Sequence, residues 1–93
     1  MKRNYLVGYD ISDEKRLAKI AKVMQGYGSR LQYSFFHCVL SERQKVKMKE
    51  SLQKIVDDVE DQVIILPVTE AQLKDIEFIG FKTNLAAEGI IIV

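Results

Sequence analysis

The sequence predicts an α+β fold in which an antiparallel sheet carries two helices on one face. Strand-forming segments at 4–10, 30–40 and 62–68 are rich in β-branched and aromatic residues. The two segments between them repeat apolar residues at helical spacing. The resulting order, β-α-β-β-α-β within 93 residues, is typical of the ferredoxin-like architecture. That architecture hosts binding proteins and enzymes alike, so function must be argued from particular residues.

Length and composition describe one small globular domain spanning residues 1–93, with 47% apolar and 29% charged residues. The sequence has no apolar run near the roughly 20 residues that cross a bilayer, and it lacks the features of a secretory signal. Cys38 is the only cysteine, so an intrachain disulfide is excluded. We therefore expect a cytoplasmic protein that does not contact membranes.

The first strand, at 4–10, is apolar on both faces, which predicts a central position in the sheet. Ser12 is the predicted N-cap of a helix that runs to about Tyr27. Gly28 is predicted to close this helix in the left-handed conformation. The predicted buried stripe of the helix consists of Leu17, Ile20, Ala21 and Met24.

Residues 30–40 form either one long strand or two short strands with a reversal near Ser34. Ser41 begins a capping-box pattern that predicts a second helix fraying near Asp57. The strand at 62–68 contains Pro67, which predicts an edge or a strand end. The predicted apolar stripe of the second helix consists of Met48, Leu52, Ile55 and Val59.

The last quarter of the chain is predicted to hold a short helical turn capped by Thr69 and a short strand at 77–81. An extra C-terminal strand is expected at about 88–93, where four β-branched apolar residues end the chain. An exposed apolar end strand invites pairing with another chain. It therefore either extends the sheet of a partner subunit in a homodimer or docks on its own sheet.

Asp10 ends the first strand where the first helix is about to begin. A carboxylate at this position can hold Mg²⁺ or Mn²⁺, or it can simply cap the helix. One carboxylate is a poor metal site. A two-fold axis near Asp10 would bring two copies together, so that both share a cation and orient a water for attack on a phosphodiester.

The net charge of +1 hides an asymmetry along the chain. Residues 1–54 carry a net charge of +7, and residues 55–93 carry −6. Lys15, Lys19 and Lys22 are predicted to share one exposed side of the first helix, flanked by Arg16. Such a stripe either contacts a phosphodiester backbone or is only a solvated helix face.

The remaining reactive or aromatic side chains favour structural roles. His37 lies in an alternating strand pattern and is expected to support the strand rather than act as a general base. Cys38 has no neighbouring acid or base pattern that would make it a nucleophile. The four tyrosines can stack on bases, but we expect them in the core: Tyr5, Tyr9, Tyr27 and Tyr33.

Four segments in unbroken order identify a family resemblance. They are Tyr-Asp-Ile-Ser-Asp at 9–13, a Lys/Arg-rich helix ending in Tyr-Gly, Arg-Leu-Gln-Tyr-Ser-Phe-Phe at 30–36, and Leu-Pro-Val-Thr-Glu-Ala-Gln at 66–72. Together they resemble CRISPR-associated protein two, the smaller of the two universal spacer-adaptation proteins. The resemblance covers residues 4 to 80, whereas residues 81–93 match no motif.

The resemblance implies a ferredoxin-like homodimer that cleaves single-stranded RNA or double-stranded DNA and binds an adaptation integrase. It makes Asp10 the catalytic, metal-binding carboxylate at the dimer axis, with Mg²⁺ or Mn²⁺ as cofactor. His37 and Val39 depart from the acidic residues that many members carry there, which removes negative charge near the cleft. The implied substrate-binding residues are Tyr9, Arg16, Lys19, Arg30, Ser34 and Phe36.

Three other functions are compatible with the same pattern. The dimer can be a non-catalytic scaffold that bridges DNA and docks the integrase. A small regulatory module that binds a metabolite shares the fold, although the basic first half argues against it. A related toxin-type RNA-cleaving protein of the same fold is the last alternative.

Overall fold

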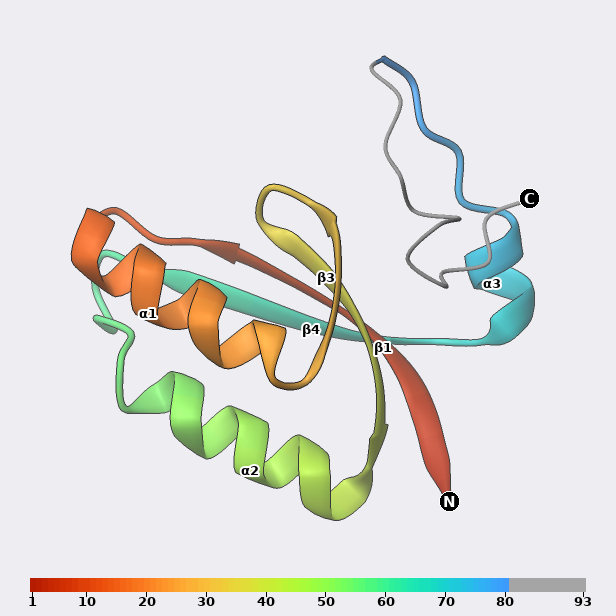
Figure 1. Ribbon diagram of the computed structural model, residues 1–93, viewed down its shortest axis with the longest axis horizontal. Helices are drawn as coiled ribbons and strands as arrows, with labels where there is room; N and C mark the ends of the chain where they lie inside the picture. The colour runs from red at the N-terminus through yellow and green to blue at the C-terminus, as the bar shows by residue number, and fades with distance from the viewer. Residues whose placement is uncertain (81–93) are drawn as a thin grey trace.

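The computed structural model describes residues 1–80 of the chain, and Figure 1 shows their arrangement. The elements are β1 (Lys2–Asp10), α1 (Glu14–Gln25), β2 (Gly28–Gln32), β3 (Phe35–Ser41), α2 (Glu42–Gln53), β4 (Gln62–Val68) and α3 (Glu70–Lys74). This confirms the predicted β-α-β-β-α-β order. The C-terminal strand predicted at 88–93 lies outside the described residues.

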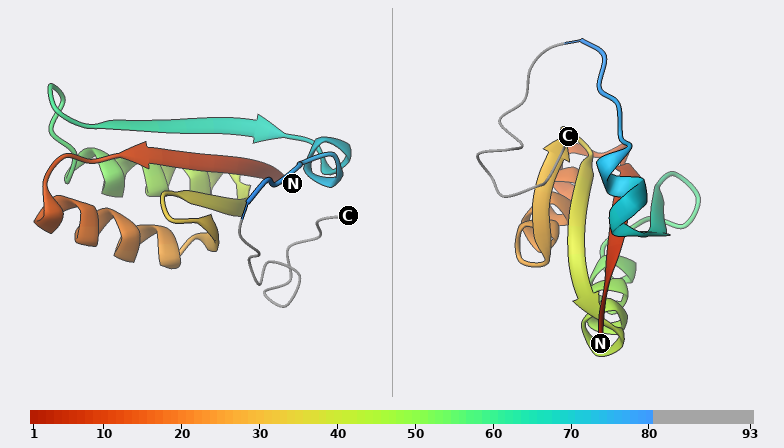
Figure 2. Two further views of the ribbon diagram at one scale, coloured as in Figure 1. Left: turned by 90° about the horizontal axis from the view of Figure 1, so that it is seen from above. Right: turned by 90° about the vertical axis from the view of Figure 1, so that its right-hand side faces the viewer.

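The four strands form one sheet in the order β2-β3-β1-β4, and all neighbours are antiparallel. β1 is central, as its apolar character on both faces predicts. Among the strands of residues 1–80, β4 lies at an edge of the sheet, a position where a proline such as Pro67 is tolerated. Figure 2 shows α1 and α2 together on one face of the sheet.

The two faces of the sheet differ in what they bury. Tyr5, Val7 and Tyr9 of β1 point toward the helices, and the core gathers around them. The other core members come from the remaining strands and from both helices: Ile20, Met24, Phe36, Cys38, Leu40, Met48 and Leu52. Burying each large apolar side chain contributes about 1.5–3 kcal/mol.

The opposite side of the sheet, called here the open face, carries the alternate residues of the same strands. Phe35 and Val39 of β3 and Ile64 and Leu66 of β4 are 43–54% exposed there. Phe78 packs with Leu6 and Leu31 in a small second cluster. Large apolar side chains thus remain in contact with solvent on this face.

Within the part of the chain that the structure describes, two of the three helix starts follow the prediction. Ser41 and Thr69 both form complete capping boxes. At α1 the N-cap is Asp13, whose Oδ2 accepts from the Arg16 backbone N–H at 2.9 Å. The prediction of Ser12 as the cap was wrong because Ser12 donates through its backbone N–H and its hydroxyl to Asp61.

The prediction for Gly28 was also wrong. α1 ends at Gln25 with Gly26 as a right-handed C-cap, and Gly28 is the first residue of β2. Among residues 1–80 only Gly80 has a positive φ. Glycine is needed at 28 for space, because a Cβ there would lie 2.3 Å from the His37 carbonyl oxygen.

The remaining boundaries sharpen or correct the prediction. Residues 30–40 belong to two strands, β2 and β3, joined by a turn at 33–34. α2 ends at Gln53 rather than near Asp57, so Val59 lies beyond the helix and is 93% exposed instead of buried. Residues 77–80 form no strand, contrary to the expectation for 77–81, whose last residue lies outside the described part.

Candidate functional site

Asp10 is the last residue of β1 and lies opposite Gln62 of β4 in the strand register. Its side chain is exposed, and within residues 1–80 its carboxylate makes no hydrogen bond or ion pair. Beside it the sheet is hollowed by about 200 Å³. Gly8, Tyr9, Phe35 and Ile64 complete the lining of this hollow with Asp10 and Gln62.

The strand end that carries Asp10 is held on both sides. Toward β4 it is paired through Gln62, and toward the hairpin the Tyr9 backbone N–H donates to the Ser34 carbonyl oxygen at 3.1 Å. The ring of Phe35 lies so close over Gly8 that a Cβ there would be 2.8 Å from the ring. Asp10 therefore sits on a rigid strand end beside an apolar hollow.

Within residues 1–80, Asp10 is not accompanied by enough further ligands to make a metal site by itself. Among residues 1–80 no group of three or more His, Cys, Asp or Glu side chains comes together. Mg²⁺ is usually bound through one or two carboxylates together with water and substrate phosphate. Asp10, an exposed hard oxygen donor with no competing partner in the described residues, fits that chemistry if a second copy supplies the other carboxylate.

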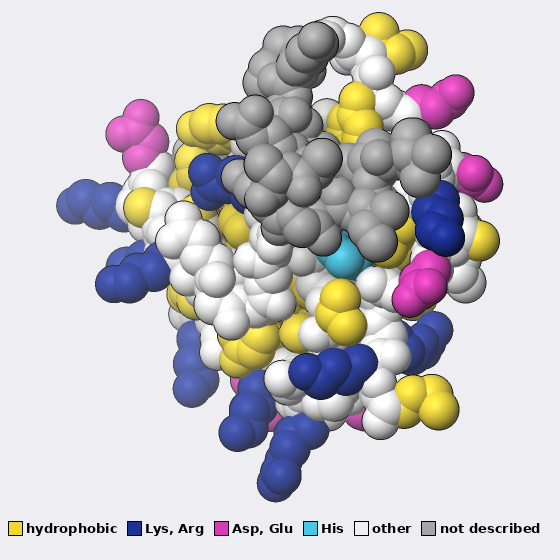
Figure 3. Space-filling model, turned by 45° about the vertical axis from the view of Figure 1, so that its right-hand side comes forward, with side chains coloured by type: hydrophobic (Ala, Val, Ile, Leu, Met, Phe, Trp, Pro, Cys, Tyr) yellow, Lys and Arg dark blue, Asp and Glu magenta, His cyan; other side chains and the backbone are white. Residues whose placement is uncertain are grey.

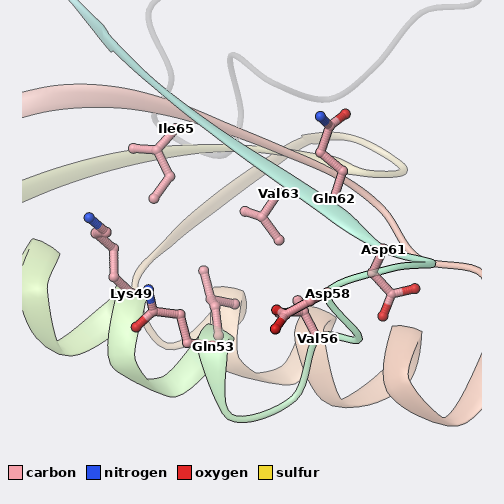
Figure 4. A pocket seen from close by; sticks show the side chains of 9 residues that line it. Lys49, Gln53, Val56, Asp58, Asp61, Gln62, Val63 and Ile65 are labelled. Carbon is pink, nitrogen blue, oxygen red and sulfur yellow. The ribbon is translucent and has the colours of Figure 1, made fainter.

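A second carboxylate, Asp61, organises the connections next to Asp10. Its oxygens accept from the Ser12 backbone N–H at 3.0 Å, from Arg16 Nε at 2.8 Å and from the Asp57 backbone N–H at 2.8 Å. We call this arrangement the Asp61 clamp. The clamp ties the β1–α1 connection to the α2–β4 connection, and Figure 4 shows the Asp61 side chain turned toward α1.

The clamp shifts the ionisation of its members. The Asp61 side chain is fully covered, and its hydrogen bonds from Arg16 and from the Asp57 backbone hold the pKa of the carboxyl well below its usual range. The hydrogen bond to Asp61 raises the already high pKa of Arg16. Arg16 also pairs with Glu60 at 3.2 Å. Its guanidinium, predicted to contact substrate, is thus directed to two carboxylates of its own chain.

The predicted lysine stripe is present on α1. At about 100° per residue, Lys15, Lys19 and Lys22 fall within roughly 60° of one another, and all three are exposed. Arg16 lies on a different side of the helix, toward the Asp61 clamp. Figure 3 shows Lys and Arg side chains gathered along the left and lower border of the molecule.

Arg30 of β2 lies over the ring of Phe36, with the guanidinium carbon 5.2 Å from the ring centroid. Phe36 is only 1% exposed and stacks on Tyr9 at 6.2 Å between centroids. Burial raises the pKa of Tyr9, against the opposing influence of the neighbouring Arg30 charge. Phe36 and Tyr9, predicted as substrate contacts, thus lie mainly in the core beneath Arg30.

The predicted site residues are consequently divided by the sheet. Asp10 is on the open face, and the Ser34 turn is pinned to the same strand end. Arg30 and the lysine stripe lie on the side of the helices. The sheet thus separates the Asp10 carboxylate from Arg30 and the lysine stripe. The end of β1 belongs to both sides, because Tyr9 faces the helices and Asp10 faces the open face.

His37 and Cys38 occupy structural positions. The Asn4 side-chain oxygen can only accept, so His37 Nε2–H donates to it at 2.9 Å. Partial burial lowers the pKa of His37. Burial raises the pKa of the Cys38 thiol to about 11, which keeps it protonated and unreactive near neutral pH.

Sequence reasoning missed Asp61, Gln62 and Tyr33. Asp61 and Gln62 acquire their roles from partners about 50 residues away, and no local motif marks them. Tyr33 was expected in the core but is 76% exposed at the hairpin turn. Its place beside Ser34, where a reversal was predicted, is the one signal that could have indicated exposure.

No helix among residues 1–80 is long and apolar enough to span a membrane. The fold and the site define a ferredoxin-like domain with a basic helix on one side of the sheet and, on the other, a strand-end carboxylate that has no hydrogen-bond or ion-pair partner among residues 1–80. The family model described as CRISPR associated protein Cas2 matches residues 3–76. The chain therefore belongs to the Cas2 family, as the resemblance of its motifs predicts.

Individual relatives agree with this assignment. The chain is 34% identical over 89 residues to "CRISPR-associated endoribonuclease Cas2 3" of Synechocystis sp., covering 96% of this chain and 97% of the relative. It is 39% identical over 67 residues to "CRISPR-associated endonuclease Cas2 2" of Thermus thermophilus, covering 72% and 74%. The crystal structure of Streptococcus pyogenes Cas2 superposes with a TM-score of 0.76 at 30% identity, covering 83% and 99%. These matches argue against the metabolite-binding module and the toxin-type protein.

Proposed function

We propose that the protein is a metal-dependent endonuclease of CRISPR adaptation that cleaves single-stranded RNA or double-stranded DNA as a homodimer. The observation that carries this proposal is the Asp10 carboxylate, which is exposed at a paired strand end next to a hollow in the open face and has no partner among residues 1–80. Family membership and the nuclease names of the relatives support it.

The proposed dimer joins two open faces. Four large apolar side chains of β3 and β4 are about half exposed there, and a second copy would remove them from water. A two-fold axis is the commonest symmetry of homodimers and applies the same patch to itself. Because Asp10 lies at the end of this same face, the axis can bring two Asp10 carboxylates together.

The two sides of the sheet then have different roles: Asp10 acts at the phosphodiester that is cleaved, and the lysines hold the nucleic-acid backbone away from it. The two Asp10 carboxylates hold the cation, and β1 fixes their position through its pairing with β4 and its bond to the hairpin turn. A bound Mg²⁺ or Mn²⁺ supplies the activation of water and offsets charge on the phosphate. Lys15, Lys19 and Lys22 provide cationic contacts for the nucleic-acid backbone.

The test compares wild type with Asp10→Asn on labelled single-stranded RNA and duplex DNA, in Mg²⁺, Mn²⁺ or EDTA. We expect cleavage by the wild type that requires metal, and only the EDTA background from Asp10→Asn. Titration calorimetry with Mn²⁺ gives a second readout, in which the variant loses the wild-type binding signal. Asp58→Asn, which removes an exposed carboxylate outside the hollow, is the matched control.

A second candidate function is a non-catalytic dimeric scaffold that bridges DNA and docks the adaptation integrase. The observation that favours it is the lysine stripe, which is independent of Asp10 and lies on the other side of the sheet. Tight duplex binding without cleavage by wild type and by Asp10→Asn would reject the nuclease and support the scaffold. Metal-dependent cleavage that survives in Asp10→Asn would reject the proposed role of Asp10.

A further inference from the structure

A cavity of about 370 Å³ opens on the helix side of the sheet, between α1 and the β2–β3 hairpin. Leu17, Ala18 and Ala21 of α1 line it with apolar side chains. Ala18 and Ala21 are three residues apart on one helix face, and their side chains end at Cβ. The α1 part of the lining is therefore apolar and short, which leaves room for a flat ring.

The walls of this cavity are polar and aromatic. Arg30 of β2 and Tyr33 of the hairpin turn line it from the hairpin, and Glu14 and Tyr9 complete the lining. Tyr33 is 76% exposed, although tyrosines are usually intermediate in burial. Arg30 is held over the Phe36 ring and forms no ion pair within residues 1–80. A fixed cation and an exposed aromatic ring thus face the same space.

Unpaired nucleobases are recognised by this combination of groups. Bases stack on tyrosine rings and on Arg guanidinium planes, at about 1–3 kcal/mol per base. The Glu14 carboxylate can accept hydrogen bonds from base N–H groups, and Arg30 can donate to base or phosphate oxygens. All of these groups lie within one cavity.

The lysine stripe runs beside the cavity. Lys15 and Lys22 stand three residues before and four residues after Ala18, so they are its neighbours on the helix surface. A strand whose phosphates follow these lysines would place its bases over the cavity mouth. In a duplex the faces of the bases are stacked and their edges paired, so a base cannot enter without being flipped out.

We propose that this cavity takes one unpaired base of a single-stranded nucleic acid whose phosphates follow the lysine stripe. The proposal rests on the proposed nucleic-acid function and deepens it, because it assigns the recognition of single strands to a site separate from Asp10. Duplex DNA, by this account, uses the lysines and leaves the cavity empty.

The test measures binding by fluorescence anisotropy in EDTA, with a labelled 12-nucleotide single strand and a labelled 20-base-pair duplex. Tyr33→Ala is expected to weaken single-strand binding roughly 5- to 150-fold and to leave duplex binding unchanged. Tyr33→Phe, which keeps the ring, is expected to bind both probes like the wild type. Since Tyr33 is largely exposed, neither change should disturb folding.

A second variant blocks the cavity without removing any charge or ring. Ala18→Leu is expected to weaken single-strand binding selectively, and Ala71→Leu on the exposed face of α3 is the matched control. A single strand containing 2-aminopurine should lose fluorescence on binding wild type, through stacking, and keep it with Ala18→Leu. Equal losses for both probes, unchanged single-strand binding in Tyr33→Ala, or no single-strand binding by wild type would overturn the proposal. Because EDTA prevents metal-dependent cleavage, the assay measures binding alone. Its result can therefore be interpreted even if the nuclease hypothesis is wrong.

Discussion

Gly28 shows how strongly one position can be determined by a distant strand. The residue begins β2, and its α-carbon faces the backbone of β3 so closely that a methyl group would lie 2.3 Å from the His37 carbonyl oxygen and 2.6 Å from Cys38 Sγ. A backbone carbonyl in a paired strand cannot move aside as the end of a flexible side chain can. The β2–β3 hairpin, which carries Arg30 and Tyr33, therefore depends on the missing side chain.

We predict that Gly28→Ala lowers the free energy of unfolding by at least about 2 kcal/mol, because the hairpin must shift to admit the methyl group. Urea unfolding followed by circular dichroism measures the loss. Gly26→Ala is the control, since Gly26 is exposed, has right-handed geometry and would place its Cβ 3.3 Å from the nearest atom. It should change stability by less than about 1 kcal/mol. Similar effects of both substitutions would contradict the close-approach explanation.

Residue-level predictions from sequence succeeded where the cause is local. The capping boxes at Ser41 and Thr69 need only residues three apart, and both formed as predicted. The roles of Ser12 and Gly28 were mispredicted because each is decided by a partner that folding brings close, Asp61 for one and the β3 backbone for the other. Arg16 was read as a free cation for the same reason.

At the scale of elements, the Asp61 clamp joins the two connections that flank the strand pair of Asp10 and Gln62. Its donors come from the start of α1 and from the loop after α2, so the two helices are linked at one end. Asp57 adds to this order, because its carboxylate accepts from the backbone N–H groups of Val59 and Glu60, which lowers its pKa. The loop before β4 thus has a defined path.

The clamp predicts a specific dependence of stability on pH. The folded-state pKa of Asp61 lies below the unfolded value of about 3.9, so its contribution is complete above that value and is lost as the pH falls toward the folded pKa. Asp61→Asn should therefore lower the melting temperature at pH 7, and the difference from wild type should shrink between about pH 5 and pH 2.

Thermal melts across this pH range, followed by circular dichroism, provide the measurement. Asp58→Asn is the matched control, because Asp58 is exposed and takes no part in the clamp. Its curve should run close to that of wild type. A gap between Asp61→Asn and wild type that stays constant down to pH 2 would show that the carboxylate's charge is not what stabilises the connection.

Elements were predicted better than their ends. The central place of β1 follows from an apolar pattern on both faces. Pro67 predicted an edge or a strand end, and β4 is an edge strand among residues 1–80. The end of α2 could not be placed because Ile55 and Val56 continue the apolar pattern beyond Gln53 and pack against the core from the loop. The spacing of apolar residues indicates which side chains are buried, and it does not show where the helix ends.

For the whole molecule, the main feature is the separation of charge and apolar surface. The basic residues of α1 lie on the side of the helices, and the half-exposed apolar side chains lie on the open face with Asp10 at their end. A nucleic acid held by the lysine stripe and a second copy seated on the open face would not compete for the same surface.

This separation predicts the effect of reversing charge on α1. Lys15→Glu with Lys19→Glu should weaken duplex DNA binding and reduce the slope of log K against log salt by about 2, because each lost phosphate contact accounts for about 0.9. Lys47→Glu with Lys49→Glu on α2 makes the same change in net charge and is the control. Equal slopes for the two double variants would show that the weaker DNA binding results from the lower net charge and not from loss of the lysine stripe. The slopes are measured by anisotropy titrations at salt concentrations from about 50 to about 200 mM.

Tyr9 and Asp10 are adjacent in the chain but face opposite sides of the sheet, one toward the core and one toward the open face. Insertions and deletions are consequently tolerated very differently in β1 and in the connections. Removing or inserting one residue within β1 would exchange its two faces, placing the carboxylate in the core and the tyrosine ring in solvent. Variation in length among such chains is therefore expected to fall in the connections and to spare the central strand.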